Sequence, residues 1–564
     1  MAGTQAMLAP SGLSSMQVSA VLAFFLFAGL YCYAELLEYA RRSKYSRARS
    51  GDDDDDEEVG KEGPLGKDAS LGSPAGSSSP REFTFMGSGF AQCLMLKQKA
   101  LLESRIYLRA AVEFGLIMLW FYVVDRTTVF TPYGTKSYSR DVLSFIFIVL
   151  TIVAFWKSLK KYNRGPDLLN RQQTEEWKGW MQVLFLLYHY FNAREIYNAI
   201  RVFIAGYVWM TGYGNFMYYY HYKDFCLGRF VQMMWRLNFL VTIVCIVLRN
   251  SYMLYYICPM HTIFTVFVYA TLGLGQKYNA TNAGILIKIG LCVLLIYVCW
   301  DIKAVFYAIW SPFMFLVGYS DPRKPTDDLL HEWHFRSSLD RYVWIHGMLC
   351  AYLKPWGEGF LQRIDALAFR ARLAARTAVI AGALVVLAVW YQNIYVLPKV
   401  EYNKVHPYTS WVPISVWVVL RNVTPEMRTY SLGIYGWLGT ITLETYISQF
   451  HTWLTTGLPD GQPKMLLSFL PSEDYPLLNF ALATAVYVYV SHRLFHLTAT
   501  LKTAVVPNKA GRELMRNVVL ILVSGAVLWV CALLVIGITG LSGVIEVAAN
   551  SSTLLEASST RQLL

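Results

Sequence analysis

The chain has 564 residues, of which 55% are hydrophobic and only 16% are charged, whereas soluble domains usually carry about 25% charged residues. This deficit excludes an ordinary soluble protein and predicts an all-α fold, a polytopic bundle of transmembrane helices, because ionised side chains are costly where they face lipid. The net charge of +12 comes from basic residues beside apolar segments, a pattern that orients membrane helices and argues against nucleic-acid binding.

Apolar segments long enough to cross a bilayer recur along the chain. A bilayer core needs about 20 apolar residues per helix, and roughly eleven to thirteen segments qualify. Their centres lie near Leu22, Leu116, Phe147, Leu184, Ala205, Leu240, Phe267, Leu294, Phe313, Val385, Leu438, Ala483 and Leu528. We divide the chain into an N-terminal span at 1–40, a loop at 41–93, a polytopic module at 94–504, and a last span with its tail at 505–564.

The loop at 41–93 changes character along its length. It starts with basic residues, passes through the acidic run Asp52–Glu58, and becomes rich in Gly, Ala, Ser and Pro up to Pro80. Such a composition cannot bury enough apolar surface to offset the entropy of ordering. We predict a disordered loop, which is either a regulatory or spacing element or a tolerated insert.

Basic loops predict the orientation of the bundle. Lysines and arginines follow the first span at 41–49, follow the third at 157–164, and precede the last at 502–516. These sides are expected in the cytosol, which places the N-terminus in the lumen. Glycosylation sequons stand at Asn279, Asn422 and Asn550, but they do not decide the topology.

The densest polar cluster inside an apolar region begins at His189. Arg194, Asn198 and Arg201 follow at i, i+4 and i+7, a spacing that places them on one face of a helix. One interpretation is a basic wall for an anionic or acyl-bearing ligand, with His189 as the base. The other is a structural ion-pair network, in which Glu195 pairs with a neighbouring arginine.

A second cluster follows in the next stretch of chain. Two glycines flank Tyr213 and precede Asn215, and an aromatic run ends at His221. This pattern predicts a broken helix at the membrane surface, which is tolerated where it lines a cavity. An interfacial aromatic belt explains the tyrosines, but explains Asn215 and His221 less well. Arg236 and Asn238 then stand inside the following apolar segment.

The third cluster contains Glu444, Ser448 and His451 at i, i+4 and i+7. An acid, a hydroxyl and a base would then share one helix face. The same side chains also suit hydrogen bonding between helices, which contributes only about 0.6 kcal/mol per contact on average. The spacing leaves both interpretations open.

The remaining histidines add one candidate. His346 stands on an aromatic amphipathic stretch close to Asp340 and Arg341, and we include it among the possible bases. Neither the pair at 331 and 334 nor the pair at 492 and 496 has an obvious third ligand, so no metal is expected. The chain has no phosphate-binding loop, dinucleotide glycine pattern or nucleophile elbow.

Together these clusters resemble a known family. The runs that carry the likeness are Tyr188–Ala193, Asn198–Arg201, Tyr207–Phe216, Trp235–Asn238 and Leu443–His451. In combination they are similar to the plant REDUCED WALL ACETYLATION family. The same polytopic acyltransferase module, from about residue 94 to about residue 504, resembles that of animal sialic-acid O-acetyltransferases and fungal capsule O-acetylation proteins.

The resemblance implies a multi-pass Golgi membrane protein required for O-acetylation of cell-wall polysaccharides such as xylan, xyloglucan and pectin, with acetyl-CoA as the donor. The animal relatives carry a lumenal SGNH esterase-like domain before the module, where this chain has only the acidic linker. The acetyl group is therefore expected to pass to the polysaccharide directly or to a separate lumenal SGNH-type acetyltransferase. Membrane lipid is the other expected partner.

Within this interpretation acetyl-CoA binds from the cytosolic side, and His189 or His451 acts as a base or holds the acetyl group. Arg194, Arg201 or Asn238 stabilises the developing oxyanion. An alternative function is a transporter that moves acetyl-CoA or another acetyl donor into the lumen, since embedded arginines suit an anionic cargo equally well. A third alternative is a scaffold that recruits glycosyl- and acetyltransferases. The sequence fixes neither the polysaccharide nor the oligomeric state.

Overall fold

The computed structural model describes residues 13–51, 89–127, 129–130, 134–162, 167–471, 474–507 and 511–539. Most of the predicted loop, from 52 to 88, and the sequon at Asn550 lie outside these residues. The described chain is dominated by helices, which confirms the all-α membrane fold. Seven of the described helices are long and apolar enough to cross a membrane, and two shorter ones are also apolar. The predicted eleven to thirteen spans also include more polar helices, such as those near Leu184 and Ala205.

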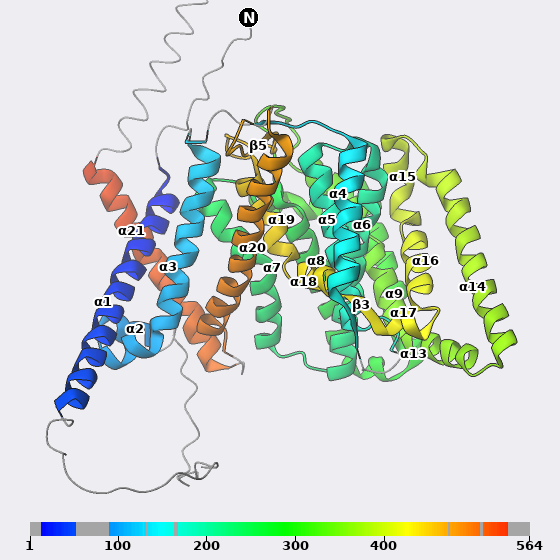
Figure 1. Ribbon diagram of the computed structural model, residues 1–564, viewed down its shortest axis with the longest axis horizontal. Helices are drawn as coiled ribbons and strands as arrows, with labels where there is room; N and C mark the ends of the chain where they lie inside the picture. The colour runs from blue at the N-terminus through cyan, green and yellow to red at the C-terminus, as the bar shows by residue number, and fades with distance from the viewer. Residues whose placement is uncertain are drawn as a thin grey trace, which may run out of the picture. The chain divides into compact units, whose positions relative to one another are not determined.

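The chain divides into two compact units, and the smaller one contains Leu13–Leu116 and Ala499–Val547. Its helices are α1 (Ser15–Gly51), α2 (Phe90–Leu94) and α21 (Arg512–Thr539), with the first part of α3 (Gln98–Arg126) and the end of α20 (Pro476–Val505). The first helix therefore continues beyond the predicted boundary at residue 40. Helices α1 and α21 lie side by side (Figure 1), and the Ser19 hydroxyl is 3.5 Å from the Leu528 carbonyl oxygen.

The larger unit contains Ile117–Thr498 and holds the remaining helices. Its longer helices are α4 (Arg140–Ser158), α5 (Arg171–Phe191), α6 (Tyr197–Tyr222), α7 (Leu227–Leu248), α8 (Ile257–Gly273), α9 (Asn282–Ile296), α13 (Val343–Asp365), α14 (Phe369–Trp390), α15 (Lys399–Thr409) and α16 (Trp411–Asn422). Its shorter helices are α10 (Lys303–Trp310), α11 (Met314–Val317), α12 (His331–Leu339), α17 (Pro425–Thr429), α18 (Gly433–Thr440) and α19 (Thr442–Ser448).

Short strands and tight turns connect these helices. The strands β1 (Gly134–Thr135), β5 (Met465–Leu466) and β4 (Leu454–Thr455) form one antiparallel sheet in that order, and β2 (Leu159–Lys161) pairs with β3 (Tyr430–Leu432). The 3-10 turns are η2 (Arg194–Ile196), η3 (Tyr252–Tyr255), η4 (Gln276–Ala280) and η6 (Ser311–Phe313). The π-helical turns are η5 (Tyr297–Asp301), η7 (Tyr391–Tyr395) and η8 (Gln449–Trp453).

Helix α5 is defined by polar residues at both ends. The Asn170 side chain accepts a hydrogen bond from the Gln173 amide at 2.9 Å, which satisfies one of the donors that a helix N-terminus leaves unpaired. At the other end Asn192 adopts a left-handed conformation with φ 55°, which asparagine tolerates better than most residues. The chain then turns through η2 and returns as α6.

Helices α5 and α6 are packed against their neighbours through glycines. A Cβ atom on Gly212 of α6 would lie 1.9 Å from the Trp344 carbonyl oxygen of α13, and one on Gly347 of α13 would lie 2.2 Å from the Trp209 carbonyl oxygen. Helix α5 meets α18 in the same way through Gly179. Small residues at such contacts let helix backbones approach closely in membranes. The predicted helix break near Gly212 is therefore wrong: α6 is continuous, and the glycine is needed for packing.

The segment around Leu438 is also different from the prediction. In place of one long span, the chain forms α18, α19 and the π-helical turn η8 in succession. Glu444 and Ser448 belong to α19, whereas His451 belongs to η8. A π-helical turn has a wider hydrogen-bond register than an α-helix, so the i, i+4, i+7 spacing does not place these three side chains on one face.

Replacing Gly212 by Ala should destabilise the larger unit, because the new methyl group meets a backbone carbonyl oxygen that cannot move aside. Overpacking of this kind costs about 1–3 kcal/mol. We expect a lower melting temperature for detergent-purified Gly212→Ala. Gly214→Ala is the matched control, since a Cβ atom there has no neighbour within 4 Å. Equal melting temperatures for the two variants would contradict the packing.

Candidate active site

A cavity of about 280 Å³ lies in the larger unit where α5 ends and α6 begins. Its walls also include residues of η3, α12 and the connection between β4 and β5. Aromatic side chains are abundant among them, including Tyr188, Tyr256 and Phe450. His189 and Arg201, from the first polar cluster of the sequence, both line this cavity.

His189 is oriented by the π-helical turn η8. Its Nδ1 atom lies 3.0 Å from Oε1 of Gln449, and the Gln449 amide nitrogen donates to the Tyr446 carbonyl oxygen at 3.0 Å. Because the amide oxygen is an acceptor, Nδ1 of His189 is the donor. The other ring nitrogen, Nε2, then carries the lone pair that a general base requires.

Arg201 is a buried cation whose guanidinium is paired with protein groups through only one of its three nitrogen atoms. Its side chain is 1% exposed, and Nη2 donates to Oδ2 of Asp340 at 2.7 Å. Asp340 also lies 3.4 Å from Nε2 of His406. Among the described residues, Nε and Nη1 of Arg201 find no hydrogen-bond acceptor. Unpaired buried donors are costly, and a ligand that brings negative charge into the cavity would satisfy them.

Three further cations line the same cavity. Arg336 donates from Nε to Glu332 at 2.7 Å, and its guanidinium lies 4.6 Å from the centre of the Tyr256 ring. Lys136 donates to the Pro463 carbonyl oxygen at 2.8 Å, and burial lowers the pKa of this lysine to about 8. With Lys399 there are four lining cations and one lining carboxylate, so the cavity favours negative charge.

These cations were not among the predicted site residues. Lys136 and Arg336 lie in a connection and a short helix between the apolar segments. The prediction considered charged residues inside the apolar segments and therefore did not include them. The sequence does contain one signal for Arg336, which follows Glu332 by one helical turn in a polar stretch that was considered only for its histidines.

His451, the second predicted base, lies beside this cavity but does not line it. Its Nδ1 atom is 2.9 Å from Oδ2 of Asp125, and its Nε2 atom is 2.5 Å from the Tyr255 hydroxyl. His451 and Asp125 are fully buried. Phe450 separates this group from the open space, because its ring lines the cavity and lies 5.8 Å from the Tyr255 ring.

The other predicted residues lie elsewhere. The proposed single face of Arg194, Asn198 and Arg201 is wrong, because α6 begins only at Tyr197 and Arg194 is exposed in η2. Asn198 instead donates to the carbonyl oxygens of Tyr395 and Leu397 at 2.7 and 3.0 Å. Glu195 pairs at 3.2 Å with Arg140, which lies 55 residues earlier in the chain and is not one of the neighbouring arginines of the cluster.

The candidates of the second cluster and His346 are also outside the cavity lining. His221 is exposed at the end of α6. Asn215 donates to the Thr211 carbonyl oxygen at 2.9 Å within its own helix. His346 lies 3.3 Å from the Ser415 hydroxyl.

The remaining polar residues connect helices. Arg236 forms a two-pronged ion pair with Glu444 across the larger unit. Asn238 bonds to Tyr252 and Thr262, and the Ser448 hydroxyl is 2.6 Å from that of Ser491. The contacts of these residues match the interpretation in which they form hydrogen bonds and ion pairs between helices. Their role in substrate binding stays a prediction.

The buried group around Asp125 should be essential for stability. Asp125 accepts hydrogen bonds from Arg126 at 2.5 Å and from the Thr456 amide at 2.7 Å. Asp125→Asn leaves the Arg126 guanidinium without its counter-charge, and breaking a buried pair costs about 3–5 kcal/mol. We expect a clearly lower melting temperature in detergent.

The control is Glu195→Gln, which removes an exposed pair worth at most about 1 kcal/mol. A melting temperature for Asp125→Asn as high as that of this control would refute the structural role of the buried carboxylate.

Comparison with known proteins finds a matching family model and a similar curated protein. Residues 80–519 match the family model of the 10 TM Acyl Transferase domain found in Cas1p. The N-acetylneuraminate (7)9-O-acetyltransferase of Danio rerio is 30% identical over 430 residues, which cover 72% of this chain and 52% of that protein.

This chain thus spans about half the length of that curated relative. The predicted resemblance to sialic-acid O-acetyltransferases is confirmed, while membership of the plant family stays a prediction. No solved structure is significantly similar. Because the family match covers most of the chain and includes every residue that lines the cavity, the chain belongs to the family of 10-TM acyl transferase domains found in Cas1p.

Proposed function

We propose that the chain is a membrane O-acetyltransferase that takes the acetyl group from acetyl-CoA and passes it to a hydroxyl group. The observation that carries this proposal is one cavity in which His189 has a free lone pair and Arg201 has unpaired donors. The family assignment and the printed activity of the Danio rerio relative support the same reaction class.

The side chains of the cavity suit acyl transfer to an alcohol. Nε2 of His189 takes the proton of the acceptor hydroxyl while its oxygen attacks the acetyl carbonyl carbon. Negative charge then develops on the carbonyl oxygen, where Nε and Nη1 of Arg201 supply donors. As the C–S bond breaks, the coenzyme leaves as a thiolate that takes the proton from His189, so charge and protons balance.

The acceptor is a hydroxyl group of a cell-wall polysaccharide, such as xylan, xyloglucan or pectin, or of a lumenal SGNH-type acetyltransferase that completes the transfer. This part of the proposal, like the Golgi location, rests on the sequence resemblance to the plant family. The aromatic lining of the cavity, with Tyr188, Tyr256 and Phe450, is compatible with a sugar ring as well as with a protein side chain.

Replacing His189 by Ala should abolish most of the transfer, because a positioned general base contributes about 10²–10⁴-fold to such a rate. The measurement uses protein in liposomes with labelled acetyl-CoA outside, and follows labelled product and released coenzyme A. His221→Ala is the control, since this exposed histidine lies outside the cavity lining. Thermal unfolding of each variant separates loss of the base from loss of the fold.

His451→Ala is measured in the same experiment, because His451 is the second predicted base although it does not line the cavity. If both His189→Ala and His451→Ala transferred label at the wild-type rate, the assignment of a histidine base would be eliminated. Intact acetyl-CoA that accumulated inside the liposomes, with no coenzyme A released, would instead establish the transporter.

The rate of transfer should decline as the pH rises through about 8. Burial lowers the pKa of Lys136 to this value, so the lysine is charged below pH 8 and neutral above it. Its protonated fraction falls roughly tenfold between pH 7 and pH 9, and the cavity loses one cation that stabilises the oxyanion and the departing thiolate.

The other charged or titratable groups that line the cavity are His189, Arg201, Glu332, Arg336, Lys399 and several tyrosines. Lys136→Arg isolates the lysine from them, because arginine keeps its charge over this range. We expect a flat rate between pH 7 and pH 9 for this variant. A decline as steep as that of the wild type would show that another group titrates.

A further inference from the structure

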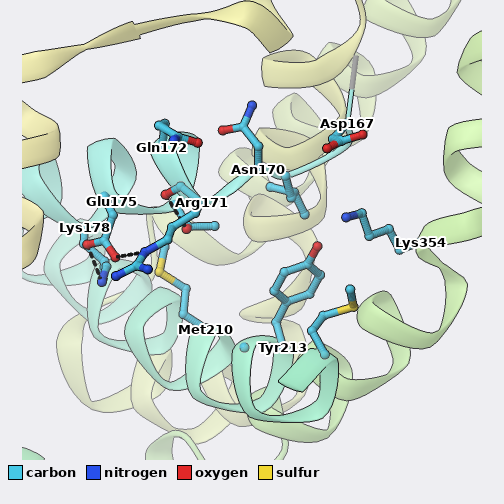
Figure 2. A pocket seen from close by; sticks show the side chains of 13 residues that line it. Asp167, Asn170, Arg171, Gln172, Glu175, Lys178, Met210, Tyr213 and Lys354 are labelled. Carbon is cyan, nitrogen blue, oxygen red and sulfur yellow. Dashed lines mark hydrogen bonds and ion pairs between the residues drawn. The ribbon is translucent and has the colours of Figure 1, made fainter. Parts of the chain in front are cut away.

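A second cavity lies in the larger unit at the opposite end of α5. It has a volume of about 440 Å³ and is formed by the connection that leads into α5, the N-terminus of α5, the second half of α6 and Lys354 of α13. Figure 2 shows its side chains converging from this connection and from the three helices. Its size is within the range of about 300–1,000 Å³ that is usual for small-molecule sites.

Three cationic side chains line this second cavity. Lys178 lies 2.7 Å from Glu175, and Arg171 lies 3.8 Å from the same carboxylate (Figure 2). Lys354 comes from the other side, where it is 3.6 Å from Glu358. Arg171 is at the first turn of a 21-residue helix, where the helix dipole also favours an anion.

A buried hydroxyl group offers a ligand a hydrogen-bond partner in this cavity. Tyr213 is 6% exposed, and its hydroxyl has no hydrogen-bond partner among the described residues. The side chain points into the second cavity between Asn170 and Lys354 (Figure 2). Its ring is held by stacking on Trp209, with 4.9 Å between the ring centres. A fixed and unpaired donor of this kind suits a ligand oxygen.

The other residues that line the second cavity limit the kind of anion that it can bind. Met210 and Met217 provide apolar, polarisable surface for a flat ring, and Asp167 and Glu175 provide acceptors for amino or hydroxyl groups. A ligand that combines phosphate, an aromatic base and sugar hydroxyls matches all three features. We propose that the second cavity binds a phosphorylated nucleoside, namely the nucleotide end of coenzyme A.

This proposal rests on the proposed function, in which coenzyme A carries the donor group. The rise of an α-helix places Lys178 and His189 about 16 Å apart along α5, so one coenzyme with its pantetheine arm extended has the reach to span both positions. The second cavity is also near the basic residues Lys160 and Lys161 of β2, because β2 pairs with β3 and the Leu432 amide of β3 donates to Glu176 near the start of α5. The sequence analysis predicts these basic residues to be cytosolic. Donor and acceptor would then approach α5 from opposite ends.

The test measures equilibrium binding of adenosine 3′,5′-bisphosphate, which carries the nucleotide end without the pantetheine arm, to the full chain in detergent. Tyr213→Phe removes only the hydroxyl and Lys354→Gln removes only a charge. We expect each to weaken binding by about tenfold or more. Lys404→Gln makes the same charge change at an exposed position and should leave binding unchanged, as should His189→Ala.

Two other outcomes would overturn the proposal. Wild-type affinity in both Tyr213→Phe and Lys354→Gln would show that the nucleotide binds elsewhere. Loss of nucleotide binding when phosphatidylinositol is added to the micelles, but not with phosphatidylcholine, would assign the second cavity to a lipid headgroup instead.

Transfer of labelled acetate is measured on the same preparations to separate this inference from the proposed function. Normal transfer combined with unaltered nucleotide binding in the variants rejects only the second cavity. A wild-type protein that neither binds coenzyme A nor transfers acetate rejects the proposed function, and the inference with it.

Discussion

The hydrogen bond between Asp125 and His451 is the contact on which the rest of the site depends. It holds the π-helical turn η8 against the end of α3, and the same turn presents Gln449 to His189 on α5. A regular α-helix would direct these neighbouring side chains differently. Because the turn is wider than an α-helix, one short segment reaches two helices that are far apart in the sequence. Its position therefore determines both the tautomer and the orientation of the candidate base.

The same structure shows how a largely apolar bundle keeps its charges. Arg236 is paired with Glu444, and Arg341 is paired with Asp301 at 2.8 Å. Arg201 alone among these three leaves two of its donor atoms without an acceptor among the described residues. Pairing removes most of the cost of burying a charge, so the incompletely paired cation is the one that points to a ligand. This distinction separates the arginines that are paired between helices from the candidate for ligand binding more clearly than position in the sequence does.

Much of the fold was predictable from hydropathy, because a helix is the simplest way to satisfy backbone groups in lipid. Each predicted centre from Leu22 to Leu528 falls within an α-helix, except Phe313, which stands in the 3-10 turn η6. Two local features were not predictable. A glycine that breaks a helix cannot be distinguished in a sequence from a glycine that lets two helices pack closely, as Gly212 does. The π-helical turn at 449–453 also has no clear signature in a single sequence.

The candidate site was predictable in part. His189 and Arg201 were singled out because polar side chains are conspicuous in an apolar region, and both line the first cavity. Their partners were not found, since Gln449 and Asp340 are 260 and 139 residues away along the chain. Pairing across such separations depends on how the helices pack, which spacing within one helix does not describe. Asp125 and Tyr255, the partners of His451, were not predicted for the same reason.

The unpaired nitrogen atoms of Arg201 couple the folding of the chain to the binding of anions in the cavity. The lining residues come from segments that are far apart in the sequence, so an anion that accepts hydrogen bonds from Nε and Nη1 binds the folded chain and not the unfolded one. Such binding stabilises the folded state by an amount that grows with the concentration of the anion. Small anions that reach this position would therefore act as stabilisers during purification while competing with the proposed substrate.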